Sequence, residues 1–268
     1  MTDIQSFERG RANRDQALFN RMAEKYARKD TLAGMRIARK HRAIATWTAM
    51  GQIRVPRILE MGCGAGFSAR YLQGHFVSYL GLDYSGELIR LAEDLNGGPS
   101  IQFQEGDATG FLPVDPPDAV LLIGVLHHLD DPLAALKHCY RILKPGGHVL
   151  ANEPQNSNRL IGFVRNVRRR VDGDYSDEQV FFQPGELAGL ASSAGFENPQ
   201  TRGQGLLTTP FAEVALPGQG LLAPIVHAFS FVDAFLEKEA APLMKRLAWN
   251  VVLVAEKPSA PRTDRKSP

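Results

Sequence analysis

The stretch RILEMGCGAGFSARYL, residues Arg57–Leu72, decides the fold of this chain. An apolar run is followed by three glycines spaced GxGxG and then by a helical pattern, which predicts a strand, a tight turn and a helix. A turn of this kind brings backbone N–H groups and the positive end of a helix close to a ligand. The stretch therefore predicts a small-molecule site at the end of a strand.

Strand-like and helical patterns alternate after this stretch, which predicts a parallel sheet in an α/β fold. Ser85 and Asp131 each precede a helical pattern and are expected to cap a helix, and Gly195 is expected to end another. Two helical segments before the sheet, around 17–28 and 32–50, are expected to form a lid. Further strands are predicted at 76–83, 101–104, 118–124, 148–152 and 249–257.

Glu60, at the mouth of the glycine turn, separates two classes of ligand. Dinucleotide-binding proteins carry GxGxxG at this place, whereas Gly62, Gly64 and Gly66 are spaced GxGxG. A carboxylate there repels a pyrophosphate and attracts an ammonium group. The pattern disfavours an NAD-linked oxidoreductase and favours S-adenosylmethionine, which carries an α-amino group and a sulfonium.

Two further carboxylates follow the next two strands. Asp83 closes YLGLD, where it can accept bonds from both ribose hydroxyls, and Asp107 follows the third strand, where it can accept a bond from an adenine amino group. Ala108 leaves room beside Asp107 for the ring. Because open α/β sheets bind ligands at the carboxyl ends of their strands, Glu60, Asp83 and Asp107 are expected to surround one cofactor.

With these residues placed, segment 57–154 resembles the class I S-adenosylmethionine-dependent methyltransferases. The stretches LEMGCGAG, LGLDYS, EGDA, GVLHHLDDP and RILKPGGHVLANEP match motifs of that family in order. The earlier stretch FNRMAEKYA (19–27) is similar to the lid helix of its small-molecule and ubiquinone-biosynthesis subgroup. The resemblance implies a Rossmann-like seven-stranded mixed sheet of order 3-2-1-4-5-7-6, with strand seven antiparallel and helices on both faces.

The matched motifs also imply a set of cofactor contacts. We expect a helical lid at 1–50, a core at 51–257 that includes an apolar insertion at about 203–247, and a disordered tail at 258–268. Contacts to S-adenosylmethionine are implied for Tyr26, Glu60, Gly62, Cys63, Gly64, Gly66, Asp83, Tyr84, Gly106, Asp107, Ala108 and Gly124.

Three residues near the expected methyl group are candidates for catalysis. Methyl transfer to oxygen needs an aligned acceptor and a group that takes its proton. His127 and His128 follow the fourth strand, and an imidazole suits proton removal near neutral pH, with His128 preferred. Glu153 ends the fifth strand, where it can orient one imidazole or bind the acceptor. A structural role in the loop is the alternative for all three.

Composition and charge limit the partners. A net charge of +2, with 44% hydrophobic and 22% charged residues, is typical of a globular protein and disfavours nucleic acid as the acceptor. Cys63 and Cys139 have no CxxC or Cys/His spacing, so no metal site is predicted and a reducing compartment is expected. The chain starts without an apolar signal segment, which favours a cytoplasmic protein without a transmembrane span.

Two regions outside the motifs bear on acceptors and partners. The stretch RLIGFVRNVRRRV, with Arg159, Arg165 and 168–170, predicts a basic amphipathic helix that holds an anionic acceptor, contacts lipid headgroups, or is simply solvated. The stretch LLAPIVHAFSFVDAFL (221–236) is apolar nearly all round. It predicts a covered helix, a homodimer contact or an apolar wall of the acceptor pocket, in preference to a membrane span.

The sequence therefore predicts transfer of a methyl group from S-adenosylmethionine to a small-molecule or lipid-like acceptor by in-line displacement. Oxygen is the expected acceptor atom, with nitrogen and carbon open. The alternative function is a noncatalytic S-adenosylmethionine-binding module that regulates or recruits a partner. The apolar insertion motivates that alternative.

Overall fold

The computed structural model describes residues 2–51, 54–107, 109–158, 161–162, 181–213 and 219–259. Its centre is a seven-stranded sheet of order β3-β2-β1-β4-β5-β7-β6, which confirms the predicted topology. The first five strands are parallel, and β7 runs antiparallel to both β5 and β6. The strands are β1 (Val55–Met61), β2 (Phe76–Asp83), β3 (Ile101–Glu105), β4 (Ala119–Ile123), β5 (His148–Pro154), β6 (Glu197–Gln204) and β7 (Asn250–Glu256).

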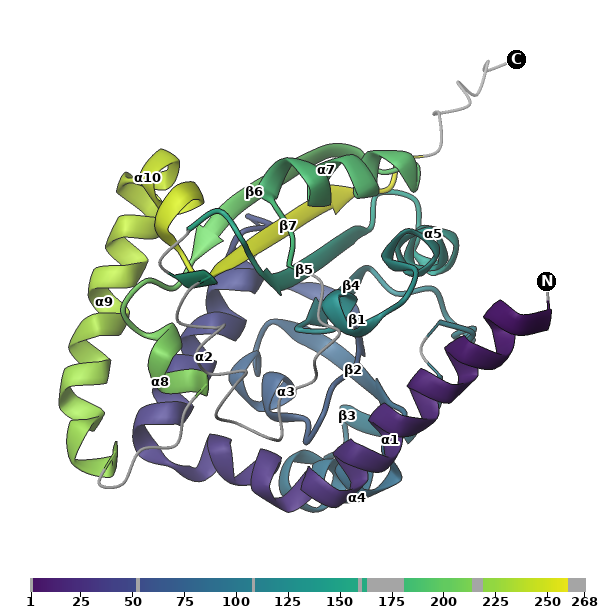
Figure 1. Cartoon of the computed structure of the whole chain (residues 1–268), viewed down its shortest axis with the longest axis horizontal. Coiled ribbons are helices and arrows are strands. Elements are labelled where there is room, and N and C mark those ends of the chain that lie inside the picture. Colours follow the sequence, from purple (N-terminus) through teal and green to yellow (C-terminus); the bar gives the residue numbers. More distant parts are fainter. Residues whose placement is uncertain are drawn as a thin grey trace, which may run out of the picture.

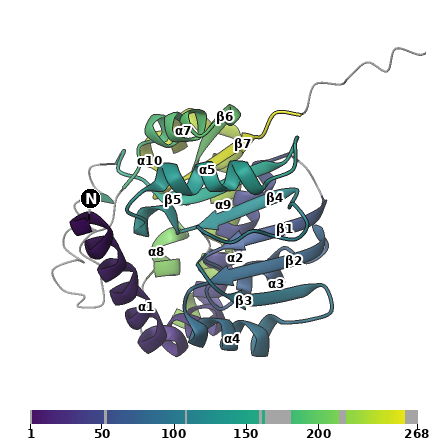
Figure 2. The same cartoon turned by 90° about the vertical axis from the view of Figure 1, so that its right-hand side faces the viewer.

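Helices cover both faces of this sheet (Figure 1, Figure 2). Buried side chains of α5 and α7 pack on one face against β4, β5 and β7, and those of α2, α3 and α4 pack on the other face against β1 and β2. The helices are α1 (Thr2–Thr31), α2 (Ala33–Thr48), α3 (Phe67–Tyr71), α4 (Gly86–Asn96), η1 (Leu126–His128), α5 (Pro132–Ile142), α7 (Pro184–Ser193), α8 (Thr209–Glu213), η2 (Gln219–Leu222), α9 (Ala223–Glu239) and α10 (Ala241–Leu247).

The predicted helix caps are confirmed. The Ser85 hydroxyl accepts a hydrogen bond from the backbone N–H of Leu88 at 3.2 Å, and an Asp131 carboxylate oxygen accepts one from Ala134 at 2.8 Å. Each cap satisfies a backbone donor that the first helical turn leaves without a partner. The caps fix where α4 and α5 begin, and therefore fix the loops at the carboxyl ends of β2 and β4.

The N-terminal segment is more helical than the sequence predicts, because α1 begins at Thr2 and runs without a break to Thr31. It lies across the carboxyl end of β2, where Gln16 donates to the carbonyl of Tyr84 at 2.6 Å. Asn20 accepts a hydrogen bond from the Ser85 hydroxyl at 2.6 Å. Helix α1 therefore covers the edge of the sheet at which the cofactor motifs end.

One strand has no counterpart in the residue patterns. The stretch ENPQTRGQ forms β6, an edge strand paired only with β7 among the described strands. Its polar residues are exposed along most of its length, so the apolar alternation that marks a half-buried strand is missing. Because Gly203 and Gln204 belong to β6, the apolar insertion begins at Gly205 and not at Gly203.

Several predictions lie outside the described residues. They concern Ala108, the basic stretch with Arg159, Arg165 and 168–170, and the end of the tail at 260–268. The roles expected for these residues stay predictions.

Gly66 offers a direct test of the glycine turn. It has a φ of +75°, and an added Cβ would overlap the ring of Phe103. We expect Gly66→Ala to lower the free energy of unfolding by about 2–4 kcal/mol, because it adds backbone strain and a clash. Urea unfolding measures the change. In the control Gly98→Ala, whose added Cβ meets no atom within 4 Å, stability should hardly change, and equal midpoints for both variants would contradict this account of the turn.

Candidate functional site

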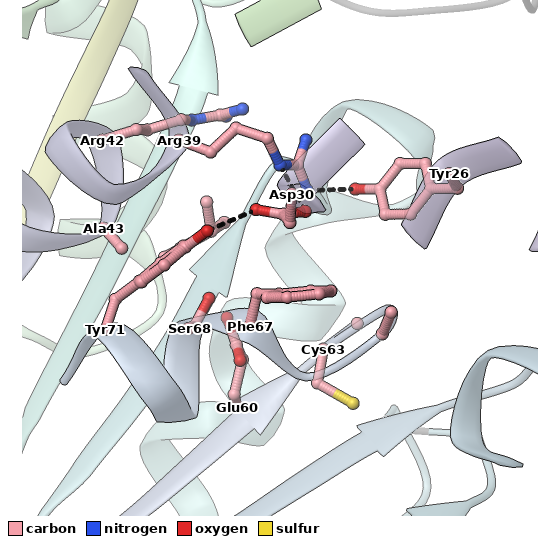
Figure 3. Close-up of a pocket in the computed structure, with 13 residues that line it drawn as sticks. Tyr26, Asp30, Arg39, Arg42, Ala43, Glu60, Cys63, Phe67, Ser68 and Tyr71 are labelled. Atoms are coloured by element: carbon pink, nitrogen blue, oxygen red, sulfur yellow. Dashed lines mark hydrogen bonds and ion pairs between the residues drawn. The ribbon is translucent and has the colours of Figure 1, made fainter. Parts of the chain in front are cut away.

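A cavity that opens to solvent lies between the glycine turn and the N-terminal helices (Figure 3). Its floor is formed by the end of β1, the turn and α3, and its cover by α1 and α2. Polar and charged groups from all of these elements face one another across it. The lining residues are Tyr26, Asp30, Arg39, Arg42, Ala43, Glu60, Gly62, Cys63, Ala65, Phe67, Ser68, Tyr71 and Ile123.

Glu60 is the acidic residue on the floor of the cavity, and it is only 1% exposed. Burial raises the pKa of its carboxyl group to about 7, although hydrogen bonds from Tyr79 and Ser68 oppose the change. The Tyr79 hydroxyl, on β2, donates to one carboxylate oxygen. Glu60 therefore gains or loses its charge near neutral pH, and a cation beside it would favour the charged form.

Arg39, from α2, supplies the opposite charge in the cover of the cavity. Its Nε donates to Asp30 of α1 at 2.7 Å, and its guanidinium lies 5.0 Å from the centre of the Tyr26 ring. The Tyr71 hydroxyl of α3 donates to the other oxygen of Asp30 at 2.9 Å, as Figure 3 shows. Arg42, one turn further along α2, also lines the cavity. Neither arginine was predicted to line a site, because charged residues on a helix usually face solvent.

Asp83 holds the glycine turn from the end of β2. One carboxylate oxygen accepts a hydrogen bond from Gly64 N–H at 2.9 Å, and the other accepts one from Ser85 N–H at 3.0 Å. Burial raises the pKa of this carboxyl group, and the backbone donors limit the increase. Gly64 has a φ of +53°, and an added Cβ would lie 3.1 Å from the Tyr26 ring. Asp83 and Tyr26 therefore both lie against the turn, and their contacts to the cofactor stay predictions.

Gly62, Gly124 and Cys63, which are also predicted to contact the cofactor, lie at or beside this turn. Gly62 has a φ of +69° and lies against Val125, and Gly124 has a φ of +75° and lies close to the Arg42 guanidinium. Burial raises the pKa of the Cys63 thiol, so this side chain lines the cavity in its neutral form.

The residues predicted to contact the ribose and adenine of the cofactor lie outside the cavity lining. Asp107 is exposed and accepts hydrogen bonds from the backbone and hydroxyl of Thr109, at 2.8 and 2.7 Å. Gly106 donates from its backbone to the Asp83 carbonyl at 2.9 Å. The Tyr84 ring lies edge-on to Phe19 of α1, with ring centres 6.1 Å apart. Asp83, Tyr84, Gly106 and Asp107 are absent from the cavity lining, so the cavity spans only the inner part of the predicted cofactor site.

The histidine loop is organised by Glu153. This fully buried carboxylate accepts hydrogen bonds from the backbone of Val125 at 3.0 Å and Leu126 at 2.9 Å, and lies 2.7 Å from His127 Nδ1. Because a carboxylate accepts, Nδ1 carries the proton and Nε2 is the lone-pair nitrogen of neutral His127. The His128 ring lies 4.1 Å from that of His127 and 5.8 Å from Phe19. The structure therefore pairs Glu153 with His127 and gives it a structural part in the loop.

Comparison with known families adds to this geometry. Residues 59–151, from the end of β1 into β5, match the family model described as a methyltransferase domain. Over this segment the chain is similar to that family. The match includes the turn, Asp83, Asp107 and the histidine loop, and excludes the N-terminal helices and the apolar insertion.

The chain is also similar to proteins named for ubiquinone biosynthesis. The chain is 30% identical over 158 residues to a ubiquinone biosynthesis O-methyltransferase of Ralstonia nicotianae. That alignment covers 55% of this chain and 65% of the relative, just under two thirds of the relative's length. The similarity therefore covers only part of each protein.

Solved structures share the whole fold at low identity. A SAM-dependent methyltransferase of Thermotoga maritima superimposes with a TM-score of 0.63, at 21% identity, over 90% of this chain and 98% of that one. Phosphoethanolamine N-methyltransferase 2 of Haemonchus contortus, solved in complex with S-adenosyl-L-methionine, gives a TM-score of 0.55 at 16% identity, over 81% and 52% of the two chains. These likenesses support the fold of the methyltransferase domain.

Proposed function

We propose that this chain binds S-adenosylmethionine and transfers its methyl group to the oxygen of a small, lipid-like acceptor. The observation that carries the proposal is the cavity in which the Glu60 carboxyl group and the guanidinium of Arg39 face one space. An amino-acid end carries one ammonium and one carboxylate, and this pair of residues complements both charges. A pyrophosphate would meet Glu60 with like charge.

The remaining cofactor residues fit the same ligand. Asp83 lies at the end of β2 beside the turn, where a carboxylate can bind ribose hydroxyls. The bound cofactor would supply a methyl group on a positively charged sulfur, which needs an aligned nucleophile and no further activation. The chain's own contribution is then to orient the acceptor, exclude water and accept a proton.

The acceptor follows from the relatives and the surroundings of the loop. The curated relatives are named ubiquinone biosynthesis O-methyltransferases, which favours a phenolic oxygen on a molecule with an apolar tail. Phe19 lies against His128 and Tyr84, so an aromatic side chain is available beside the proposed transfer point. The proposal includes a small-molecule acceptor, no nucleic acid, and the cytoplasmic location expected from the sequence.

In this mechanism His128 accepts the acceptor's proton, and His127 with Glu153 holds the loop in place. His128 is the less buried of the two histidines, whereas His127 Nδ1 lies 2.7 Å from the buried Glu153 carboxylate. A neutral imidazole has a pKa suited to removing a proton near pH 7. Glu153 acts through the backbone of the loop and through His127.

We expect His128→Ala to lower kcat by about 10²- to 10⁴-fold, the usual contribution of a general base. The assay follows S-adenosylhomocysteine formed with a short-tailed phenolic quinol as acceptor. The affinity of the variant for S-adenosylhomocysteine should stay at the wild-type value. A kcat equal to that of the wild type, or a loss of rate that only follows a loss of cofactor affinity, would contradict the role of His128. A wild type that binds the cofactor and methylates no acceptor would instead favour the noncatalytic binding module.

A further inference from the structure

Helix α9 combines strong apolar character with exposure. Residues Gly220–Glu239 are apolar and long enough to cross a membrane by length and composition, and they are the one such helical segment among the described residues. Only 11% of the apolar window is buried. Of the three alternatives for this stretch, the described elements do not provide the covered helix, because they leave most of it exposed. The homodimer contact and the apolar pocket wall stay predictions.

The inward side of α9 is held by polar contacts to the rest of the molecule. Asp233 is fully buried and accepts backbone hydrogen bonds from Leu207 at 3.0 Å and Thr208 at 2.9 Å. Glu237 lies 3.0 Å from His41 of α2 and accepts a hydrogen bond from Gly205 N–H at 2.9 Å. These contacts dock one side of α9 on α2, along the outer edge of the molecule in Figure 1. A docked helix with a buried carboxylate is suited to lie along a surface, not to cross a bilayer.

The outward side carries the large apolar residues. At 100° per residue they spread over an arc of roughly 120°, wider than the narrow seam of a coiled coil. Two exposed leucines of α10 adjoin them in sequence, and no charged residue of α9 lies on the outward side before Lys238. The exposed apolar face of α9 and α10 consists of Leu221, Ile225, Phe231, Val232, Phe235, Leu243 and Leu247.

The charges that border this face are mainly positive. Lys238, Lys245 and Arg246 are exposed, and Glu239, which is paired with Lys238 at 3.3 Å, is the one exposed acidic residue of α9 and α10. An apolar helix face bordered by cations complements a membrane interface that contains anionic lipids.

Two of the segments outside the described residues are rich in charged side chains. The stretch 163–180, outside the described residues, carries eight charged side chains in eighteen positions. The C-terminal stretch 260–268 carries four more and one alanine as its sole apolar side chain besides proline. Burying such charges against phenylalanines would cost free energy without ionic partners.

We propose that the exposed apolar face of α9 and α10 lies in the surface of an anionic membrane. The face joins α2 through the contact between Glu237 and His41, and α2 also carries Arg39 and Arg42 into the cavity. This inference goes beyond methyl transfer, because it concerns the surface on which the molecule works.

Vesicle flotation tests this without cofactor or acceptor, so its result is independent of the proposed reaction. The wild-type chain should float with vesicles of phosphatidylcholine containing phosphatidylglycerol, and more weakly with phosphatidylcholine alone. Phe231→Ser/Phe235→Ser, at positions 66% and 64% exposed, should weaken partitioning by at least about tenfold. The control Leu112→Ser/Val114→Ser changes two exposed apolar residues, 66% and 100% exposed, in the loop between β3 and β4, and should float like the wild type.

Three results would overturn the proposal. They are a wild type that stays with neither kind of vesicle, equal losses in the two double variants, and a wild-type dimer that dissociates in the Phe231→Ser/Phe235→Ser variant while neither protein floats. The last result, measured by sedimentation velocity, would assign the face to a second copy of the chain. Loss of flotation in Lys245→Gln/Arg246→Gln from the phosphatidylglycerol vesicles alone would support the contribution of the bordering cations.

Discussion

Asp83→Ala is expected to weaken the binding of S-adenosylhomocysteine by at least about 100-fold. Two charge-assisted hydrogen bonds to ribose would be lost, each contributing roughly 1.5–3 kcal/mol, and about 3 kcal/mol corresponds to two decades in Kd. The same change removes the acceptor for Gly64 N–H and Ser85 N–H, so the glycine turn also loses its anchor. Isothermal titration of the folded variant measures the loss.

The matched control for this prediction is Glu105→Ala. Glu105 ends β3 directly beside Asp83 in the parallel register and is exposed. It carries the same charge at the same edge of the sheet, so a general electrostatic effect would appear in both variants. Binding by the Asp83→Ala variant as tight as by the Glu105→Ala variant, with both chains folded by circular dichroism, would contradict the cofactor assignment.

The second large effect is a pH dependence of cofactor binding that is set by Glu60. In the ligand-free protein the Glu60 carboxyl group has a pKa of about 7, and a cofactor ammonium group bound beside it would lower that pKa. At pH 8 the group is already charged, whereas at pH 6 binding must first remove its proton. We expect affinity for S-adenosylhomocysteine to fall about tenfold from pH 8 to pH 6, with close to one proton released on binding at pH 6. Titrations in buffers of different protonation enthalpy count that proton.

Glu60→Gln should remove this pH dependence and weaken binding at pH 8, because the ammonium group loses its charged partner. The variant should also be more stable than the wild type at pH 8 in the absence of ligand. A carboxyl group whose pKa is raised by folding contributes stability below its unfolded pKa of about 4.5, and that contribution is lost as the pH rises through about 7. The difference should approach about 3 kcal/mol at pH 8 and vanish near pH 4. An unchanged pH dependence of binding in Glu60→Gln would assign the proton to another group.

The sequence predicted the carboxylates around the glycine turn better than the cover of the cavity. Glu60 and Asp83 follow apolar strand patterns, and parallel strands bring their carboxyl ends to one edge, so their proximity follows from topology. Asp30 and Arg39 lie on two different helices, and their pairing depends on the angle between those helices, which residue patterns do not contain. The spacing of Arg39 and Arg42 on one side of α2 was the available signal.

For the histidine loop and the insertion, too, the sequence indicated the positions of residues but not their contacts. Both histidines could be placed after β4, but the choice of His127 as the partner of Glu153 depends on the turn of η1. For 221–236, the apolar pattern left a covered helix, a homodimer contact and a pocket wall open, and the described elements leave most of that surface exposed. Periodicity reports which residues avoid water, and it does not report what covers them.

The central claim is that the glycine turn and Glu60 bind the amino-acid end of S-adenosylmethionine and not a diphosphate. Calorimetric titration of the wild-type chain with S-adenosylhomocysteine, and of a second sample with NAD, tests it most directly. The account predicts saturable binding of S-adenosylhomocysteine and no heat of binding with NAD. Saturable binding of NAD, with none of S-adenosylhomocysteine, would contradict it.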